Sequence, residues 1–573
     1  MDGIPRLSRG AFLRGPAITR LGDGALGGKA SGLVRAQRVV ASLAERFAPE
    51  ELEISIPRMT VLAADCFERF LELNGLDAVA GLRDERDDVI AMAFQRGRLP
   101  ADLLGDLQSL ATEARAPLAV RSSSLLEDAL EQPFAGVYAT KMIANNQPDA
   151  ASRFRGLVEA IKLVFASTWF RDARQYIAAT RRDPAEERMA VIVQEVVGRR
   201  HGERFYPDVS AVGRSFNFYP SGHAKPDDGV TELALGLGRT IVDDGVGWAY
   251  CPRYPRTAPP YTSLRALVKQ GQTAFWAVNM GKPPAYDPTR ETEFLVQADL
   301  AAAESDGTLA WTASTYVAAD DRLVPGTSRP GPRLLDFAPL RQTRMLPFSD
   351  AVVAVLDAAR AEFAIDVEIE LAFTLDPEGA SAARLGLLQV RPMMVSAERV
   401  EISAADLEPP GLLLAAHGVL GNGAASDVTD VVLVRREAFE AGDTPGIAQE
   451  LDALNQELLA AGRPYLLVGF GRWGTSDPAG GVPVAFAQIS GARAIVEAML
   501  PGMAFRPSQG AHFFHNVTSF RVLYFSAADR SIDWSWLDAQ PALRETPRVR
   551  WIRLPAPLTI RVDGRTGQGV IRR

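Results

Sequence analysis

The stretch that most constrains the fold of this chain is residues 117–141, PLAVRSSSLLEDALEQPFAGVYATK. A short apolar strand, residues 118–120, ends in Arg121 and three serines. Arginine forms forked, charge-assisted hydrogen bonds, and serine donates from its hydroxyl and its backbone amide, so such a strand end is suited to bind phosphate oxygens. Serine and aspartate are also preferred helix N-cap residues, which leaves an ordinary polar capping loop open as an alternative.

A second anion-binding pattern lies nearer the N-terminus. Apolar residues recur there at helical spacing, so that Gly27-Gly28 opens a helix with Lys29 in its first turn. A lysine beside a glycine-rich helix start is well placed to contact an anion. The segment is not a Walker A loop, because Asp23 stands where the first glycine belongs and Ala30 where serine or threonine is required. A solvated lysine at a helix start explains the same residues.

The run MAVIVQEVV at residues 189–197 predicts a buried strand that ends in the polar pair Gln194-Glu195. Such an end fits an adenine-binding hinge, in which backbone amide and carbonyl groups contact the edge of the base. A buried strand that simply leaves the core at Gln194 is the alternative.

A further predicted hairpin carries several charged side chains. Alternation places Asp366, Glu368 and Glu370 on one face of its first strand, while Gln389 and Arg391 share a face of the second. Clustered carboxylates need a compensating cation. Their hard oxygens suit Mg²⁺, which binds one or two carboxylates together with substrate phosphates. A salt-bridged hairpin without metal is the alternative.

These patterns together resemble the ATP-binding domain of the family of pyruvate phosphate dikinase, phosphoenolpyruvate synthase and rifampin phosphotransferase. The resemblance rests on VRSS…EDxxxxxFAG, on GGKxxxL upstream of it, on an apolar strand that ends in a glutamine, and on EIEL…QVRP, which stands where the family has DIEW…QxRP. It covers residues 20–395 and implies a two-lobed ATP-grasp unit that clamps ATP and Mg²⁺.

The resemblance also implies roles for individual residues. It assigns ATP binding to Lys29, Arg121, Gly136, Thr140, Gln194, Glu195, Val196, Val197, Gln389 and Arg391. It assigns the metal to Glu370, with Glu368 beside it, and to Gln389. Arg121 and Arg391 are the expected catalytic cations, which stabilise charge on the transferring phosphoryl group together with Lys29 and Mg²⁺.

Two positions depart from the family pattern. Phe218-Tyr219 replaces an arginine-aspartate pair of the family, and Arg239 replaces the glutamate of its GLGE element. These departures concern the handling of phosphate and substrate, and they leave the expectation of nucleotide binding in place.

Beyond the Pro-Pro-Gly at residues 409–411 the family pattern stops. Residues 413–573 contain no Thr-Ser-His phosphohistidine motif and are too few for the barrel of ~250 residues that completes the dikinases, so pyruvate chemistry of the usual kind is not expected. A formal G-x-G-x-x-G at residues 469–474 precedes TSDPAGGVP, which cannot supply the helix that dinucleotide binding requires, and we reject NAD binding there.

His512 and His515 flank two phenylalanines just after a Ser-Gln-Gly turn. A histidine in such a loop is able to accept a phosphoryl group, and His512 is therefore our third catalytic candidate, as a relay. A structural histidine in an aromatic core is an equally open alternative.

The length of the chain limits the number of domains. A chain of 573 residues suggests three or four domains of ~150 residues. The predicted class is α/β (α+β), with a leader at 1–20, a first ATP-grasp lobe at 21–198, a second lobe at 199–396, a linker at 397–412 and a separate α/β domain at 413–573.

The net charge of −8 gives no reason to expect nucleic-acid or membrane binding, and no apolar run is long enough to span a membrane. Two cysteines, Cys66 and Cys251, make no disulfide framework, which favours the cytoplasm. The five histidines form no zinc-binding cluster with cysteines. The sequence allows a homo-oligomer.

The sequence therefore predicts an ATP- and Mg²⁺-dependent phosphotransferase. Its acceptor is either an unidentified small molecule held by the C-terminal domain or His512. The alternative, from a different class, is an ATP-binding regulatory or interaction protein that has lost transfer chemistry.

Overall fold

The computed structural model describes most of the chain. The described residues are 4–47, 51–76, 85–125, 127, 136–179, 187–243, 245–259, 261, 263–342, 346–375, 382–395, 400–440, 443–475, 480–500 and 511–573. Asp128, Phe134 and Ala135 of the first motif and the Ser-Gln-Gly before His512 lie outside them.

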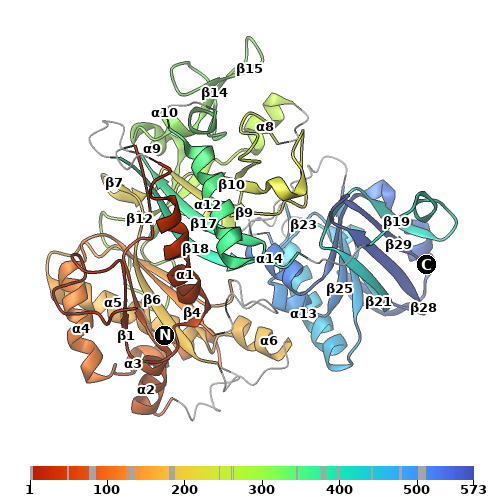
Figure 1. Ribbon diagram of the computed structural model, residues 1–573. Helices are drawn as coiled ribbons and strands as arrows, with labels where there is room; N and C mark the ends of the chain where they lie inside the picture. Colours follow the sequence, from red (N-terminus) through yellow and green to blue (C-terminus); the bar gives the residue numbers. More distant parts are fainter. Residues whose placement is uncertain are drawn as a thin grey trace.

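The first lobe is built on a mixed sheet in the order β1-β3-β6-β4-β5 (Figure 1). Its strands are β1 (Ile18–Leu21), β3 (Met59–Leu62), β6 (Met189–Glu195), β4 (Leu118–Ser124) and β5 (Thr140–Ile143). The residues of β6 up to Gln194 are buried, as the apolar run predicts. The last four residues of β4 are RSSS, and the first of them, Arg121, contacts the second lobe.

Helices cover this sheet. They are α2 (Ala64–Asn74), α3 (Asp87–Arg96), α4 (Ala101–Glu113), α5 (Ala150–Ser167) and α6 (Arg171–Ala179). α5 packs on β4, β5 and β6, and α3 and α4 pack on α5. The side chain of Asp149 caps α5 by accepting a hydrogen bond from the Ser152 amide.

The second lobe has a central sheet in the order β11-β10-β9-β17-β18-β2. Its strands are β11 (Trp248–Tyr250), β10 (Val230–Ala234), β9 (Val209–Arg214), β17 (Val367–Thr374), β18 (Ala383–Pro392) and β2 (Leu52–Ser55). β17 and β18 form the predicted antiparallel hairpin, in which Glu368 lies opposite Arg391 and Glu370 opposite Gln389.

The two lobes are interleaved in sequence. β2 pairs with β18, and α1 (Gly27–Leu43) packs on β18 and on α12 (Phe348–Phe363). Segments from the range predicted as the first lobe therefore help to build the second. Hydrophobic spacing does not reveal this exchange, because it shows that a strand is buried but not which sheet it joins.

Smaller elements complete the second lobe. One sheet has the order β13-β12-β8-β7 and another β15-β14-β16. The strands are β7 (Arg199–His201), β8 (Arg204–Tyr206), β12 (Ala274–Asn279), β13 (Leu295–Asp299), β14 (Ser314–Val317), β15 (Arg322–Pro325) and β16 (Arg333–Leu334). The helices are α7 (Arg239–Val242), α8 (Leu264–Gln270), α9 (Leu300–Ser305), α10 (Leu309–Thr312) and α11 (Ala338–Arg341).

The C-terminal α/β unit has a sheet in the order β19-β29-β28-β21-β22-β25-β26-β20, with β27 paired to β28. Its strands are β19 (Leu412–Ala416), β20 (Gly418–Leu420), β21 (Gly423–Val434), β22 (Tyr465–Phe470), β25 (Ala492–Met499), β26 (Leu523–Ala528), β27 (Ala542–Glu545), β28 (Val549–Asp563) and β29 (Gln568–Arg572). Its helices are α13 (Thr444–Ala460), α14 (His512–Ser519) and α15 (Trp534–Ala539).

Strands β21, β22, β25 and β26 are parallel neighbours, so their carboxyl ends lie at one edge of the sheet. That edge faces the ATP-grasp unit, and Figure 1 shows α14 between the two bodies. The glycine-rich loop follows β22 there. It continues into a short strand, β23 (Arg472–Trp473), which pairs with β24 (Gly481–Val482).

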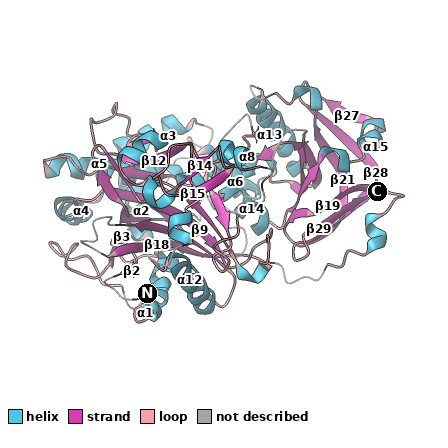
Figure 2. Cartoon of the chain, turned by 90° about the horizontal axis from the view of Figure 1, so that it is seen from above, coloured by secondary structure: helices cyan, strands magenta, loops and turns pink. Residues whose placement is uncertain are grey.

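The C-terminal unit is docked on the first lobe through α6. Tyr176 packs edge-on against Phe520 with ring centroids 5.3 Å apart, and its hydroxyl donates to Asn516 Oδ1 at 3.3 Å. Arg171 forms an ion pair with Asp452 across the same junction. Figure 2 shows α6 and α14 near each other at this junction. The aromatic contacts fix where α14 lies relative to the first lobe.

The architecture is the predicted one, an α/β protein with a two-lobed ATP-grasp unit followed by an α/β unit. Both cysteines are buried and free. Across the described parts of the chain, every helix is too short or too polar to cross a membrane.

Candidate functional site

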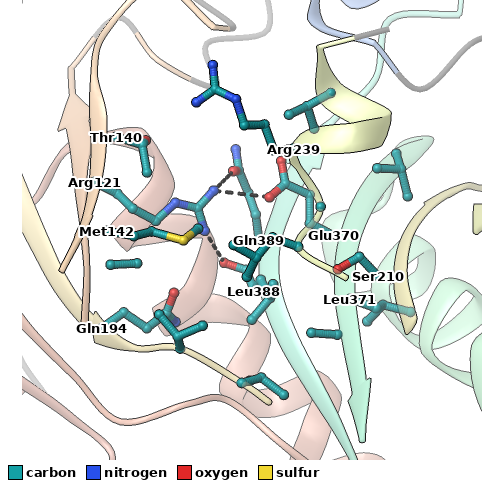
Figure 3. Close-up of a pocket in the computed structure, with 18 of the residues that line it drawn as sticks. Arg121, Thr140, Met142, Gln194, Ser210, Arg239, Glu370, Leu371, Leu388 and Gln389 are labelled. Atoms are coloured by element: carbon teal, nitrogen blue, oxygen red, sulfur yellow. Dashed lines mark hydrogen bonds and ion pairs between the residues drawn. The ribbon is translucent and has the colours of Figure 1, made fainter. Parts of the chain in front are cut away.

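A cavity of about 240 Å³ lies between the first-lobe strands β4, β5 and β6 and the second-lobe strands β9, β17 and β18 (Figure 3). Its wall brings together nearly every residue that the sequence nominates. These are Lys29, Arg121, Gly136, Thr140, Gln194, Glu195, Val196, Val197, Glu370, Gln389, Arg391 and His512. Glu368 is the exception, because it lies behind the wall.

One end of the cavity is apolar. Ala119, Met142 and Leu388 line it together with the end of β6. The amide of Glu195 donates to the Arg58 carbonyl at 2.9 Å, and that of Val196 donates to the Pro117 carbonyl at 2.9 Å. Among the described residues, the Val197 amide has no hydrogen-bond acceptor. This amide is therefore available to a ligand in the cavity.

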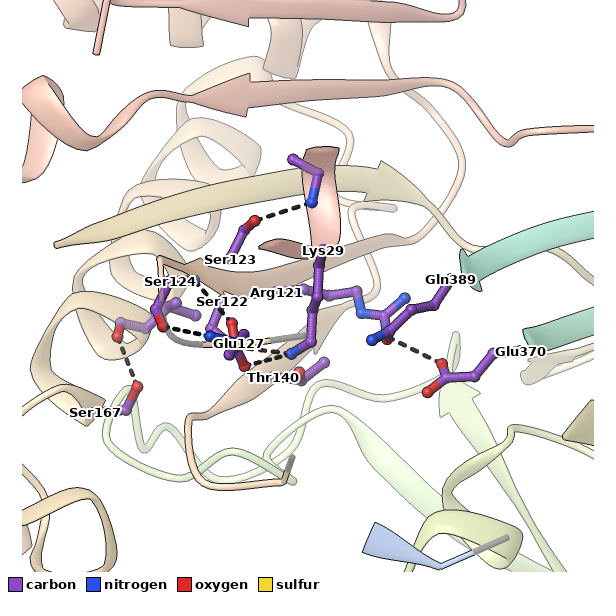
Figure 4. A network of polar contacts seen from close by, with 12 residues as sticks. Lys29, Arg121, Ser122, Ser123, Ser124, Glu127, Thr140, Ser167, Glu370 and Gln389 are labelled. Carbon is purple, nitrogen blue, oxygen red and sulfur yellow. Dashed lines mark hydrogen bonds and ion pairs between the residues drawn. The ribbon is translucent and has the colours of Figure 1, made fainter. Parts of the chain in front are cut away.

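The other end is polar, and Lys29 enters it from the first turn of α1 (Figure 4). Its Nζ donates to Glu127 Oε1 at 2.6 Å and to Ser122 Oγ at 3.2 Å. Ser122 Oγ also donates to Glu127 at 2.8 Å, and the Ser124 amide donates to the other carboxylate oxygen at 2.9 Å. The buried Glu127 therefore fixes the lysine, and two of the three serines fix Glu127.

Ser123 forms hydrogen bonds with the first turn of α1 and not with Glu127. Its hydroxyl accepts from the Ala30 amide at 3.0 Å and donates to the Leu26 carbonyl at 2.8 Å. Gly27 lies at φ +76°, and a Cβ there would stand 1.7 Å from the Ser123 carbonyl oxygen, so only glycine fits. The three serines are fully buried and position Lys29; they do not themselves line the cavity.

Arg121 reaches across the cavity from β4 to the second lobe. Its Nη2 donates to Glu370 Oε2 at 3.0 Å and to Gln389 Oε1 at 2.8 Å, and its Nη1 donates to the Leu388 carbonyl at 3.2 Å. Figure 3 shows the guanidinium pointing at these groups. The side chains of Arg121 and Glu370 retain 14% and 15% exposure, so solvent and ligands reach the pair.

Glu368 lies two residues from Glu370 and has a different environment. It is 0% exposed, and it pairs with Arg391 through Oε1 and with Arg214 Nε through Oε2 at 2.5 Å. Burial alone would raise the pKa of Glu368, but Arg214 and Arg391 hold that pKa well below its usual value. The carboxylate is thus ionised and committed to two arginines. Arg214 is a site residue that sequence reasoning missed, because the segment SAVGRSF carries no local signal.

Arg239, the departure from the family pattern, lines the cavity from α7. Its Nε lies 2.8 Å from Asp243 Oδ2, its Nη1 lies 3.9 Å from Glu291, and the guanidinium lies 5.5 Å from the Trp276 ring centroid. Glu291 in turn accepts from the Thr140 amide at 3.2 Å, which links the two lobes. Asp243 and Glu291 are further wall residues without a sequence signal.

His512 begins α14 of the C-terminal unit and still lines the ATP-grasp cavity. Gly136 packs directly on it: at φ +69°, a Cβ on Gly136 would stand 2.4 Å from His512 Nδ1. Burial lowers the pKa of His512 well below its usual value, and the charges of Arg391 and Lys29 lower it further. The imidazole is therefore neutral at pH 7.

The sequence places both histidines in a loop, and the structure corrects this to a helix. The run HFFHNVTSF has no preferred N-cap residue, since Ala511 occupies that position. Packing holds the helix instead: Phe513 lies against Gly474 of the glycine-rich loop, where a Cβ would stand 2.3 Å from the ring. The neighbouring His515, which the sequence did not nominate, is buried with Nδ1 3.8 Å from Glu368 Oε2, and burial lowers its pKa to about 4.

The oxygen donors at the polar end suit Mg²⁺. Glu370 Oε2 and Gln389 Oε1 converge on one cationic nitrogen, Arg121 Nη2, and both are oxygens of the kind that Mg²⁺ binds. Glu368 has no such capacity, because both its oxygens face arginines. Among the described residues, no group of three or more His, Cys, Asp or Glu side chains could hold a metal.

Two comparisons relate the sequence of this chain to known proteins. The model of the family "Pyruvate phosphate dikinase, AMP/ATP-binding domain" matches residues 24–409. The phosphoenolpyruvate synthase of Aeropyrum pernix is 26% identical over 209 residues. That match covers 33% of this chain and 23% of the synthase, so the chain shares about a quarter of that enzyme's length.

Proposed function

Because this chain belongs to the pyruvate phosphate dikinase AMP/ATP-binding domain family, we propose that it is an ATP-dependent phosphotransferase. ATP is bound in the cavity, with its base at the apolar end beside Val197 and its phosphates at the polar end. Lys29, Arg121 and Arg391 contact the phosphate oxygens there. Transfer is accelerated by positioning and by stabilisation of the charge that spreads over the moving phosphoryl group.

Mg²⁺, held by Glu370 and Gln389 with phosphate oxygens, would neutralise charge on the nucleotide when bound. The role of Glu368 in this proposal is to hold Arg391. Its buried carboxylate fixes the guanidinium at the cavity wall, where Arg391 is able to contact a phosphate.

The observation that carries the proposed acceptor is the position of His512. A neutral imidazole from the C-terminal unit lies in the cavity that also holds Lys29, Arg121 and Arg391. Its unprotonated nitrogen forms the N–P bond, and the P–O bond to the rest of the nucleotide breaks. The electron pair of that bond leaves on the nucleotide's phosphate oxygen. The product is a phosphohistidine that a second acceptor then discharges.

The test is incubation with ATP labelled at the γ or the β phosphate, followed by acid treatment of the protein. We expect acid-labile label on the wild type and none on His512→Gln. His223→Gln is the matched control, since His223 is an exposed histidine that is not among the described residues lining the cavity. Label that persists in His512→Gln would contradict the relay. ATP turnover unchanged in Arg121→Ala would contradict the assignment of the cavity itself.

One observation favours a second function, an ATP-binding regulatory module without transfer. Arg239 lies at the cavity wall, where the family pattern has glutamate, and its guanidinium is engaged by Asp243. That function predicts saturable nucleotide binding in calorimetry, together with no label on the protein and no turnover with any acceptor.

A further inference from the structure

Another cavity, of about 280 Å³, lies between the two lobes beyond the ends of β4 and β5. Both lobes contribute to its wall, the first through residues 115–117 and 145–147 and the second through Arg200, Phe205 and Met280. The Asn146 Nδ2 donates to the Met280 carbonyl at 2.9 Å, and the Pro117 carbonyl accepts from the Val196 amide between β6 and β7. We call this space the hinge cavity. A molecule bound in it would contact both lobes, and such junctions are frequent ligand sites.

One end of the hinge cavity carries positive charge without a counter-ion. Arg115 and Arg200 line it from opposite lobes, and none of the lining residues that the structure describes is acidic. Arg200 Nε donates to the Gly202 carbonyl at 2.9 Å, which is an uncharged acceptor. Among the described residues neither arginine forms an ion pair, whereas Arg204 on the neighbouring strand pairs with Asp306 at 2.7 Å. Two guanidinium groups are therefore free to bind an anion.

Arg153 adds to this positive charge from behind the wall. It is 1% exposed, and its guanidinium donates to the carbonyl of Gln147, a lining residue, at 2.6 Å and to that of Ala111 at 2.9 Å. Backbone carbonyls carry no net charge, so these bonds hold the guanidinium in place without neutralising it. An anion between Arg115 and Arg200 would gain from the same field.

The other end of the hinge cavity is apolar and adjoins the cavity proposed for ATP. Phe205 and Met280 line it, and both belong to a small apolar cluster that also contains Met142, Val196 and Leu237. These last three residues line the cavity proposed for ATP. One cluster of packed side chains thus contributes to the walls of both cavities, so a change of packing on one side is felt on the other.

We propose that the hinge cavity is a regulatory site for a phosphate monoester with a small apolar group. The phosphate of a monoester carries about −1.5 to −2 charges near pH 7, which matches Arg115 and Arg200, and guanidinium groups bind phosphate oxygens through paired hydrogen bonds. The apolar group packs on Phe205 and Met280.

The regulation follows from the position of the two arginines. They belong to opposite lobes, so an anion that bridges them favours the arrangement of the lobes in which the shared apolar cluster is packed. The ligand therefore tightens nucleotide binding, and by linkage the nucleotide tightens binding of the ligand by the same factor. This coupling rests on the proposed function, whereas the site itself does not.

The experiment is calorimetric titration of the full chain with phenyl phosphate. We expect Arg115→Gln and Arg200→Gln each to weaken binding at least about tenfold, and both arginines are exposed, so neither substitution disturbs the core. Arg265→Gln is the matched control, since it removes an exposed arginine of the second lobe that lines neither cavity. Phenylacetate, with the same ring and a single charge, should bind at least about tenfold more weakly than phenyl phosphate. Affinity unchanged in both arginine variants would overturn the site, and equal affinity for the two probes would overturn the phosphate assignment.

A second titration measures the coupling with the β,γ-imido analogue of ATP. Saturating phenyl phosphate should tighten binding of the analogue severalfold in the wild type and leave it unchanged in Arg200→Gln. Mutually exclusive binding of the two would place phenyl phosphate in the nucleotide's cavity and overturn the site, and independent binding would overturn the regulation. A wild type that binds phenyl phosphate through Arg115 and Arg200 but does not bind the analogue would overturn the proposed function and leave the hinge site standing.

Discussion

Glu368 and Glu370 lie two residues apart on β17 and mark two regions with opposite properties. Around Glu368 the structure is dry: the carboxylate is 0% exposed between Arg214 and Arg391, and His515 of the C-terminal unit covers it. Around Glu370 it is open, and the carboxylate shares one solvent-accessible arginine with an amide. The same residue type on one strand is thus fully enclosed by protein at one position and open to solvent at the next.

Glu368→Gln tests the difference between the two regions with the largest expected effect. It leaves two buried arginines without a counter-ion, and removal of one partner of a buried ion pair typically costs about 3–5 kcal/mol. We expect a loss of unfolding free energy of that size in urea denaturation followed by tryptophan fluorescence.

The same substitution at Glu370 is the control. Its arginine keeps Gln389 and the Leu388 carbonyl and retains access to water, so the cost should stay below about 1 kcal/mol. Equal losses for the two variants would show that the dry and open regions do not differ in energy.

Gly136→Ala tests whether close packing against Gly136 keeps His512 in the cavity. The added Cβ would stand 2.4 Å from His512 Nδ1, so the histidine or its helix must move. Displacement of a reacting group by about 1 Å is able to cost about 100-fold in rate. We expect label transfer to fall by that factor in rapid-quench experiments at saturating nucleotide.

Gly75→Ala separates displacement from backbone strain. Gly75 also has positive φ, but a Cβ there meets no atom within 4 Å. It should lose a little stability and no transfer rate. An equal fall in the rate of label transfer in Gly75→Ala would show that the loss in Gly136→Ala does not come from displacement of His512.

The last expected effect is a dependence of stability on pH on the acid side of neutrality. Burial lowers the pKa of His515 to about 4, below the 6.5 of a free histidine, so between these values the unfolded chain binds the proton that the native state excludes. Stability must therefore fall as the pH drops from about 6.5 to 4, by up to about 1.4 kcal/mol per pH unit for this group.

His512 contributes with the same sign, since its pKa is lowered too. Urea midpoints measured across this range check the slope, and His515→Gln should flatten it. A slope unchanged in that variant would mean that the histidine is not protonated on unfolding in this window.

The α/β class, the β17–β18 hairpin and the buried β6 follow from the sequence, because side-chain alternation and apolar runs are local properties. The partners of β2 do not follow, because pairing with β18 brings together residues more than 300 positions apart. The helix at His512 was missed for a related reason: it is held by Phe513 against Gly474 and by contacts with the first lobe, and not by its own caps.

The residues of the cavity were largely predictable through family motifs, while their counter-ions were not. Arg214, Asp243 and Glu291 reach the site from segments whose local pattern carries no chemistry. Glu368 shows the limit most clearly. Alternation places it on the same strand face as Glu370, yet only the position of the C-terminal unit shows that it is covered by protein and not open to ligand.

The seating of His512 has a kinetic consequence. A carrier histidine on a mobile domain would separate donor and acceptor in space, but here α14 holds the imidazole in the cavity that we propose for the nucleotide. The nucleotide donor and the final acceptor would then have to bind in the same cavity one after the other. Turnover would follow double-displacement kinetics, with parallel double-reciprocal plots, and spent nucleotide would compete with the acceptor for entry.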